Sequence, residues 1–286
     1  MGRPPPLGAR GLVLLALLAA GAWAVARLGI GDLAVGRAGL AEAGRFFSRA
    51  LSPAIISEAP PPFGGRSILP DVFEGARLTV VFAAAAVGLA WVAGLLLAFL
   101  GATAWWRGDL AGSPSLAARI ARRAAAPALY GATRALIALL RSVHEFLWAI
   151  LFLCAMGRSN ATAVLAIAIP YTGTFAKVFS EMIDEAPRGP ALALRASGAR
   201  PVHVFLFGLL PQALPDILAY TFYRFECGLR SSAVLGFFGY PTLGYFLSAS
   251  FENLYYGEVW TYLYALVALV LAMEWWSGAL RKRFVA

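Results

Sequence analysis

Charged residues are scarce in this 286-residue chain, at 14%, whereas 60% of the residues are hydrophobic and the mean hydropathy is +0.72. Soluble domains carry about 25% charged and about 45–50% apolar residues. The shortage of charge excludes a disordered chain, an ordinary soluble enzyme of this length and a nucleic-acid-binding protein with a solvated basic face. Several runs reach the about 20 apolar residues that a spanning helix needs. Because these runs are continuous rather than short alternations, we expect an all-α polytopic membrane protein and not a barrel.

Lysine and cysteine are also rare. Lys177 and Lys282 are the only lysines, so arginine carries most of the net charge of +9. Arginine in cytoplasmic loops sets the orientation of a membrane protein, which accounts for the basic balance without nucleic acid. Cys154 and Cys227 both lie in apolar runs and form no disulfide framework. We therefore interpret both as small core residues.

Motifs of enzymes are absent. The chain has no Gly-x-x-x-x-Gly-Lys phosphate loop, so it is not itself a P-loop ATPase. It also lacks His-Glu-x-x-His, Gly-x-Ser-x-Gly and Cys/His metal-ligand spacing. A membrane-embedded phosphoryl-transfer enzyme would need clustered carboxylates for a metal, and neither Glu145 nor Glu226 has a second acid near it in the sequence. We expect no catalytic residue, metal or cofactor.

About six transmembrane helices are predicted. The first run, Gly11–Ala26, also has features of a secretory signal with a cleavage site at Ala22-Trp23-Ala24, but we interpret it as a retained span because it is long and Arg27 follows at once. The remaining predicted spans are approximately Leu78–Leu100, Ala135–Met156, Ala161–Phe179, Pro211–Phe238 and Val259–Trp276. Residues 1–69 are thus predicted to hold the first span and a periplasmic amphipathic segment, and residues 70–286 a transmembrane domain.

The segments between the spans indicate the orientation. Gly36–Ser57 has apolar residues at helical spacing, which predicts an interfacial amphipathic helix. Residues 107–134 form a predicted polar loop rich in arginine, and the loop 239–257 has no arginine or lysine. Because the chain also ends with Arg281-Lys282-Arg283, the positive-inside rule places both termini in the cytoplasm of a multi-pass inner-membrane protein.

Two predicted spans contain charged residues, which are costly in a bilayer and usually functional. The third span holds Arg141, His144 and Glu145, and the fifth holds Arg224, Glu226 and Arg230. The i,i+4 spacing of Arg141 with Glu145, and of Glu226 with Arg230, would place each pair on one helix face. Three arginines against two glutamates leave surplus positive charge, which suits an oxyanion because guanidinium presents a planar fork of donors. The alternative is that these residues form structural pairs that hold the helices together.

The segment ALRASGARPVHVFLFGLLP, from Ala193 to Pro211, resembles the cytoplasmic coupling loop of ABC importer permeases. That family's pattern is Glu-Ala-Ala, three residues, Gly, nine residues, a hydrophobic residue, any residue and Leu-Pro. Ala193, Gly198, Leu210 and Pro211 fill positions of this pattern. The sequence departs from it where the family has Glu, a second Ala and the late hydrophobic residue, which are here Leu192, Leu194 and Gly208.

Two further stretches resemble the phosphonate-type permeases within that family. They are RSVHEFLWAILFLCAMG (Arg141–Gly157) and LPQALPDILAYTFYRFECGLRSSAVLGFFG (Leu210–Gly239). The second contains the subfamily's Tyr-Arg-Phe-Glu, followed by Leu-Arg-Ser-Ser where the subfamily has Val-Arg-Ser-Ala. The turn from Gly239 to Gly244 replaces a glycine-rich turn of the subfamily.

The resemblance implies a type I ABC importer permease, with ATP hydrolysis on separate cytoplasmic ABC ATPase subunits, a second permease subunit and a periplasmic substrate-binding protein. A short helix between Pro190 and Phe205, within a coupling loop at about 181–205, would dock on the ATPase. Homodimer and heterodimer remain open, as do phosphonate, phosphite, phosphate and a phosphate ester as substrate. The alternative function is a secondary transporter of an anionic solute, although the sequence shows no internal repeat.

Overall fold

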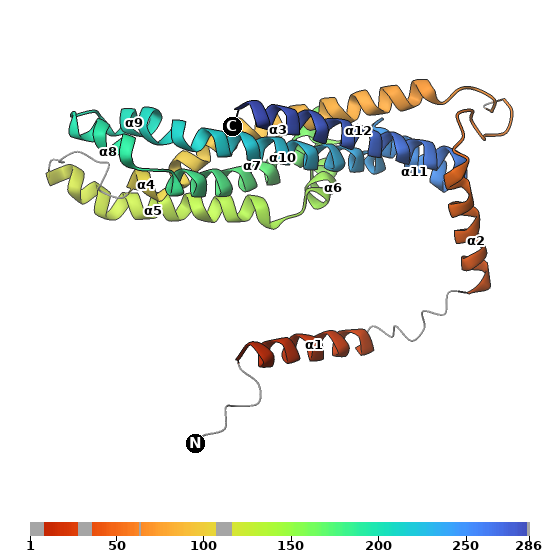
Figure 1. The fold of residues 1–286 in the computed structure, drawn as a ribbon, viewed down its shortest axis with the longest axis horizontal. Helices are drawn as coiled ribbons and strands as arrows, with labels where there is room; N and C mark the ends of the chain where they lie inside the picture. The colour runs from red at the N-terminus through yellow and green to blue at the C-terminus, as the bar shows by residue number, and fades with distance from the viewer. Residues whose placement is uncertain (1–8, 28–35, 63, 107–115, 285–286) are drawn as a thin grey trace, which may run out of the picture. The chain divides into compact units, whose positions relative to one another are not determined.

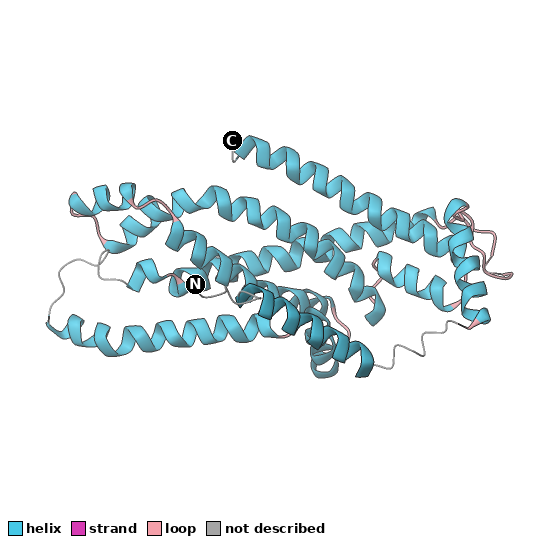
Figure 2. Cartoon of the chain, turned by 60° about the horizontal axis from the view of Figure 1, so that its bottom comes forward, coloured by secondary structure: helices cyan, strands magenta, loops and turns pink. Residues whose placement is uncertain are grey.

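The computed structural model describes residues 9–27, 36–62, 64–106 and 116–284, and these residues are almost entirely helical (Figure 2). The chain divides into two compact units, residues 1–52 and 53–286. The segment 53–68 therefore packs with the second unit. The functional division at residue 69 stays a prediction.

The first unit contains two helices. Helix α1, Ala9–Arg27, is apolar around its circumference. Helix α2, Arg37–Ser48, continues as the short 3₁₀ helix η2, Arg49–Leu51. The amphipathic helix predicted for Gly36–Ser57 is therefore shorter than expected. Pro53 explains its end, because the residue before a proline is driven out of the helical region, and Ser52 has φ −135° and ψ 65°.

The second unit is a bundle in which α3, α5, α7, α10 and α12 run along a common axis (Figure 1). Its elements are α3 (Leu69–Gly101), α4 (Thr103–Trp106), α5 (Leu116–Ser142), α6 (Glu145–Met156), α7 (Asn160–Glu185), α8 (Gly189–Ala196), α9 (Pro201–Val204), the π-helical turn η4 (Phe205–Leu209), α10 (Leu210–Val234), the 3₁₀ turn η5 (Leu235–Phe238), α11 (Leu243–Glu252) and α12 (Tyr256–Phe284).

Small residues allow α3 and α7 to form the centre of this bundle. A Cβ at Gly94 of α3 would lie 2.6 Å from the Cβ of Phe175 on α7, so only glycine permits this approach. Phe175 and Phe179 are completely buried beside it. Asp184, near the end of α7, accepts hydrogen bonds from the backbone N–H groups of Thr103 and Ala104 at 3.0 and 2.8 Å. The carboxylate thus caps α4 and fixes the chain where it leaves α3.

The third predicted span is broken. Helices α5 and α6 meet at an angle of 90°, with the break at Val143 and His144. The His144 Nδ1 atom accepts the Phe146 N–H at 3.2 Å and so caps the start of α6. The loop predicted for residues 107–134 is wrong from Leu116 onward, where helix α5 begins.

The fifth predicted span begins earlier than Pro211. Residues 201–238 form one long helix, which contains the π-helical turn Phe205–Leu209. The Leu210 N–H donates to the Phe205 carbonyl, five residues back. Proline has no N–H and its ring crowds the preceding turn, so a widened turn immediately before Pro211 relieves that crowding.

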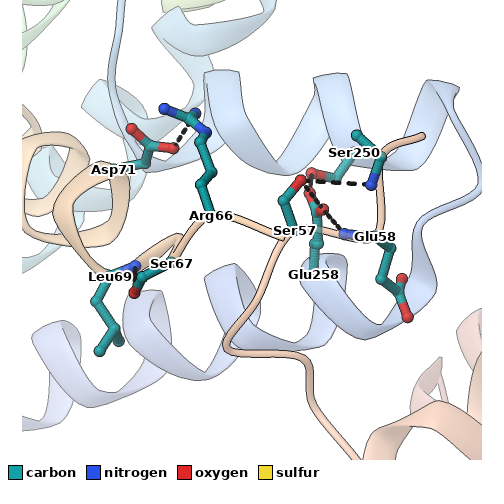
Figure 3. A network of polar contacts seen from close by, with 9 residues as sticks. Ser57, Glu58, Arg66, Ser67, Leu69, Asp71, Ser250 and Glu258 are labelled. Atoms are coloured by element: carbon teal, nitrogen blue, oxygen red, sulfur yellow. Dashed lines mark hydrogen bonds and ion pairs between the residues drawn. The ribbon is translucent and has the colours of Figure 1, made fainter. Parts of the chain in front are cut away.

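The predicted loop 239–257 contains helix α11, and the segment 53–68 is tied to this end of the bundle. The Ala54 N–H donates to the Gly257 carbonyl at 3.0 Å. The buried Glu258 carboxylate accepts the Ser57 hydroxyl and the Glu58 N–H on one oxygen and the Ser250 hydroxyl on the other (Figure 3). This cluster, formed by Ser57, Glu58, Ser250 and Glu258, is called the Glu258 cluster below.

Within the described residues, α3, α7, the helix 201–238 and α12 are long and apolar enough to cross a membrane, and the bent pair α5–α6 would make a fifth span. The apolar part of α1, Gly11–Arg27, is shorter than these. The first predicted span, Gly11–Ala26, and with it the total of about six, therefore stays a prediction. Cys154 is exposed on α6, so its expected place in the core is wrong, and Cys227 is half-buried.

Candidate functional site

A chain of polar groups joins three helices in the middle of the second unit. The Ser231 hydroxyl of α10 donates to the Glu145 Oε1 atom of α6 at 2.8 Å. The Ser231 Oγ atom also lies 3.2 Å from the Tyr171 hydroxyl of α7. Because a serine hydroxyl has one hydrogen, the Tyr171 hydroxyl is the donor in the second contact. The two bonds fix the depth of α6 and α10 against α7.

Arg224 lies on the same face of α10, two turns before Ser231, because seven residues correspond to about two turns. Its guanidinium carbon is 4.1 Å from the centre of the Tyr171 ring, which is cation–π geometry. The Nε atom of Arg224 is buried and has no hydrogen-bond partner. Gly228 makes this packing possible, since a Cβ there would lie 2.9 Å from Val87 of α3. We call Glu145, Tyr171, Arg224 and Ser231 the Arg224 cluster.

The break between α5 and α6 separates two residues that the spacing predicted to pair. Glu145 is the first residue of α6, whereas Arg141 lies in the last turn of α5. The prediction that Arg141 and Glu145 share a helix face is therefore wrong. Glu145 instead has His144 beside it, with the Nε2 and Oε2 atoms 3.6 Å apart, and the His144 side chain is exposed.

Glu226 and Arg230 share helix α10, but no ion pair forms between them in the described part of the chain, so the predicted pairing is wrong. Glu226 is buried, at 8% exposure, and its Oε1 atom has no partner. Arg230 is exposed. The two side chains thus lie in different environments one helical turn apart.

Arg141 is exposed and lines a cavity of about 330 Å³ between α5 and α7. Two further cations, Arg134 and Lys177, line the same cavity. From the sequence, Lys177 stood out only as one of two lysines, and Arg134 was expected in a loop. Tyr171 and Ser231 were not predicted as site residues, because tyrosine and serine are common in membrane helices and carry no charge to single them out.

The predicted coupling loop folds as a helix and a tight turn. Helix α8, Gly189–Ala196, carries Ala193 on an exposed position. Gly198 follows with φ +83°, a left-handed conformation that favours glycine, and the Ala199 N–H donates to the Leu194 carbonyl at 3.1 Å. Gly198 thus forms a sharp turn at the end of α8.

Gly208 explains one departure from the expected loop pattern. It is buried against α8, where a Cβ would lie 2.8 Å from the Ala191 Cα atom. A larger hydrophobic residue would push α8 away from the π-helical turn. Leu210 is half-buried and Pro211 exposed at the start of α10. The loop is thus held directly against the helix that carries Arg224.

The end of α10 is held by contacts with the start of α7. The Tyr240 hydroxyl donates to the Ser159 carbonyl at 2.9 Å, and burial raises the pKa of Tyr240, so this donor stays neutral. Gly239 has φ +83°, and its carbonyl accepts from Arg158 at 3.1 Å. No group of three or more His, Cys, Asp and Glu side chains that could hold a metal occurs in the described ranges.

Comparison with known proteins identifies the class. Residues 114–285, more than half of the chain, match the family of binding-protein-dependent transport system inner membrane components. The chain belongs to this family and is a multi-pass inner-membrane permease component.

Relatives of known name agree with this class. The chain is 36% identical over 158 residues to the phosphite transport system permease protein PtxC of Stutzerimonas stutzeri, covering 55% of this chain and 58% of that one. It is 32% identical over 199 residues to the phosphate-import permease protein PhnE of Mycolicibacterium smegmatis, covering 69% of this chain and 37% of that one. The match thus spans less than two thirds of either relative's length.

Solved structures show the same fold. The chain superposes on the MetNI methionine ABC transporter in an inward-facing conformation with a TM-score of 0.62, at 19% identity, over 77% of this chain and 98% of that one. An amino acid ABC transporter gives a TM-score of 0.59 at 18% identity, over 75% and 94%. The expected type I ABC importer permease fold is confirmed.

Proposed function

We propose that this chain is the membrane-spanning subunit of an ATP-driven importer that moves a phosphorus oxyanion, such as a phosphonate or phosphite, through a pathway lined by the Arg224 cluster. The observation that carries the proposal is the Arg224 guanidinium, stacked on Tyr171 with a buried Nε–H for which the described residues offer no acceptor. A buried donor without a partner is costly, and an oxyanion at this position would supply the missing acceptor.

The chemistry of the cluster suits such an anion. Arginine offers a rigid fork of donors that matches two oxygens of a phosphonate. The Tyr171 ring holds the fork in place, and Ser231 holds the ring's hydroxyl, so the donor geometry is set before the anion arrives. Arg141, in the last turn of α5, and His144, which caps α6, flank the bend and stay pathway predictions, with Arg141 adding positive charge there. Glu226 and Arg230 remain pathway predictions for α10.

The partners follow from the family and the coupling loop. We propose that separate cytoplasmic ATPases bind α8, that a second permease subunit completes the pathway and that a periplasmic binding protein delivers the anion. Both termini are then cytoplasmic, in keeping with the basic end of α12. Contact between Gly208 and Ala191 gives α8 a direct mechanical link to the Arg224 helix.

The test uses the complete transporter, reconstituted with its ATPase and binding protein in vesicles. Uptake of radiolabelled phosphite, methylphosphonate and phosphate is measured per assembled complex for Arg224→Gln, Arg224→Lys and the wild type. Loss of one charged hydrogen-bond donor predicts a fall of about 10- to 100-fold for Arg224→Gln. Arg224→Lys should restore little, because a point charge does not replace the fork.

Arg77→Gln is the matched control, since it removes a guanidinium from an exposed ion pair with Glu74 on α3 and should leave uptake unchanged. Wild-type uptake by Arg224→Gln would disprove the anion pathway. Uptake by the wild type without ATP, driven by an ion gradient, would instead support the secondary transporter.

A Gly198→Val variant tests the coupling loop separately. A β-branched residue is strained at φ +83°, so the turn after α8 should distort while the Arg224 cluster stays intact. We expect binding-protein-stimulated ATPase activity and uptake to become uncoupled, or the ATPase to dissociate. Normal coupling in this variant would remove α8 as the docking element.

A further inference from the structure

A basic cavity lies beside the Arg224 cluster, between α5 and α7. Its volume is about 330 Å³, and its walls are formed by Arg134, Ile137, Ala138, Arg141, Ser142 and Lys177. Three of these six residues are cations, in helices that otherwise have the composition of membrane spans. We call this space the α5–α7 cavity.

The contacts between α5 and α7 show where each of the three cations lies along the helix axes. Helices α5 and α7 are in close contact at Gly173, where a Cβ would lie 2.9 Å from the Arg141 backbone nitrogen. At the other end, the Arg134 NH1 atom donates to the Ser180 hydroxyl at 3.3 Å. Arg141 is therefore at the level of Gly173, close to Tyr171 and Arg224, whereas Arg134 lies about 10 Å further toward α8. Lys177 lies between the two levels.

Within the described residues, the charges of this cavity are not balanced. Lys177 forms an ion pair with Glu181. Among the residues that the structure describes, Arg134 donates only to neutral hydroxyls, those of Tyr130 and Ser180. Arg141 makes no ion pair with any residue in the described ranges. One carboxylate thus faces three cations.

Such a cavity does not fit a lipid-facing surface. Cations within spans face water-filled paths or protein, because exposure to hydrocarbon is costly. The Arg141 side chain is exposed, and a third of the Lys177 side chain is accessible. An anion in the cavity would neutralise the surplus charge of Arg134 and Arg141 at once.

We propose that the α5–α7 cavity is a second oxyanion-binding subsite, which receives the anion from Arg224 and passes it toward the α8 end. This rests on the proposed function for the first subsite at Arg224. Successive sites of moderate strength allow an ion to enter and also to leave, which a single tight site does not. Lysine suits the end of this subsite from which the anion leaves toward α8, because its ammonium is a compact, mobile charge without the donor fork of arginine.

The test measures the electrostatic potential inside the cavity. Ser142 lines it and is exposed, so Ser142→Cys places a thiol there, in a background with Cys154→Ser and Cys227→Ser. In the reconstituted complex, this thiol is modified with an anionic and with a cationic methanethiosulfonate reagent of similar size. We expect the anionic reagent to react faster, and sodium phosphite to slow its reaction.

Lys177→Gln and Arg134→Gln should each lower the anionic-to-cationic rate ratio by roughly 4-fold, because one unit charge about 10 Å away in nearly aqueous surroundings acts in opposite directions on the two reagents. Lys282→Gln, which removes a charge at the exposed end of α12, is the matched control and should leave the ratio unchanged. Phosphite uptake should fall about 5-fold or more in Lys177→Gln and recover in Lys177→Arg. Should Lys177→Gln fail to assemble, Arg134→Gln provides the same comparison.

Equal rates for the two reagents, or no protection by phosphite, phosphate or sulfate, would overturn the subsite. The same result is expected if an acidic side chain of a second permease copy fills the cavity, so that outcome also counts against the proposal. Failure of the proposed function has another signature. In that case the wild type transports none of the phosphorus anions, while the thiol at position 142 stays selective for the anionic reagent and is protected by another oxyanion such as sulfate.

Discussion

Glu258 and Glu226 are both buried carboxylates in helices of the same bundle, at 6% and 8% exposure, but their surroundings differ. Both oxygens of Glu258 accept hydrogen bonds, from two hydroxyls and one backbone N–H of different segments. The Oε1 atom of Glu226 accepts none, and two residues earlier the Arg224 Nε atom is also without a partner.

The difference separates a polar cluster whose hydrogen bonds are complete within the described residues from a region of α10 with two buried atoms that lack partners there. A fully satisfied carboxylate stabilises the contact that its donors make, here between the segment 53–68 and α11–α12 (Figure 3). Unsatisfied buried atoms cost free energy in the isolated chain and are explained when a ligand or subunit completes them. Changes in the Glu258 cluster should thus affect stability, and changes in the Arg224 cluster should affect transport.

The largest effect on stability is expected for Glu258→Ala. Three donors lose their acceptor, which predicts a loss of about 2–4 kcal/mol in the free energy of unfolding. Denaturant titration of the purified chain in detergent measures it. Glu274→Ala, an exposed glutamate of the same helix, is the control and should change stability by less than about 0.5 kcal/mol. A similar loss in both variants would show that the Glu258 cluster has no special role.

Ser231→Ala removes the hydroxyl between Tyr171 and Glu145. We expect a stability loss of about 1 kcal/mol and a fall of about 5-fold in uptake per assembled complex, because Tyr171 no longer holds Arg224 in one position. Ser248→Ala, which removes only a hydrogen bond within α11, is the matched control. Unchanged uptake with lower stability would show that Ser231 stabilises the fold and has no role in transport.

Asp71→Asn tests a polar contact at the edge of the Glu258 cluster. Asp71 pairs with Arg66 at 2.6 Å, but two thirds of the Arg66 side chain is exposed. Exposed pairs contribute about 0.5 kcal/mol, and salt screens them. The stability difference from wild type should therefore be small at low salt and vanish at about 1 M salt, where the Debye length is about 3 Å. A large, salt-independent loss would extend the structural cluster to Asp71.

Glu226→Gln should have the smallest effect on stability, within about 0.5 kcal/mol of wild type or slightly stabilising, because its Oε1 atom has no donor to lose and the charge is no longer buried. Uptake is measured in parallel to test its place in the pathway. A loss of stability comparable with that of Glu258→Ala would show that Glu226 also stabilises the fold, contrary to the difference drawn between the two carboxylates.

Hydropathy alone predicted most of the helices, because spanning segments must be long and apolar whatever they contact. It did not predict the break at Val143 and His144, because the polar residues there, Arg141, His144 and Glu145, were interpreted as functional groups within one continuous span. Helix α11 was missed for the opposite reason. Its ten residues are too few to distinguish a short helix from an apolar loop.

The charged members of the site could be found because charge is rare in spans, and Glu145 and Arg224 do belong to one cluster. Their partners could not be found. Tyr171 and Ser231 are ordinary residues whose role depends on packing between helices that are distant in the sequence. The predicted i,i+4 pairs were wrong because spacing guarantees a shared face only when the helix is continuous, and because a shared face does not guarantee contact.

The π-helical turn Phe205–Leu209 sets the rotation of α8 relative to α10 about the helix axis. One extra residue in a helix rotates everything beyond it by about 100°. The turn therefore acts as a phase shift between α8, which packs on Gly208, and the face of α10 that presents Arg224 to Tyr171. A one-residue deletion in the turn would rotate α8 by about 100° relative to that face of α10. The orientation of α8 can thus be altered without changing the residues that contact Arg224.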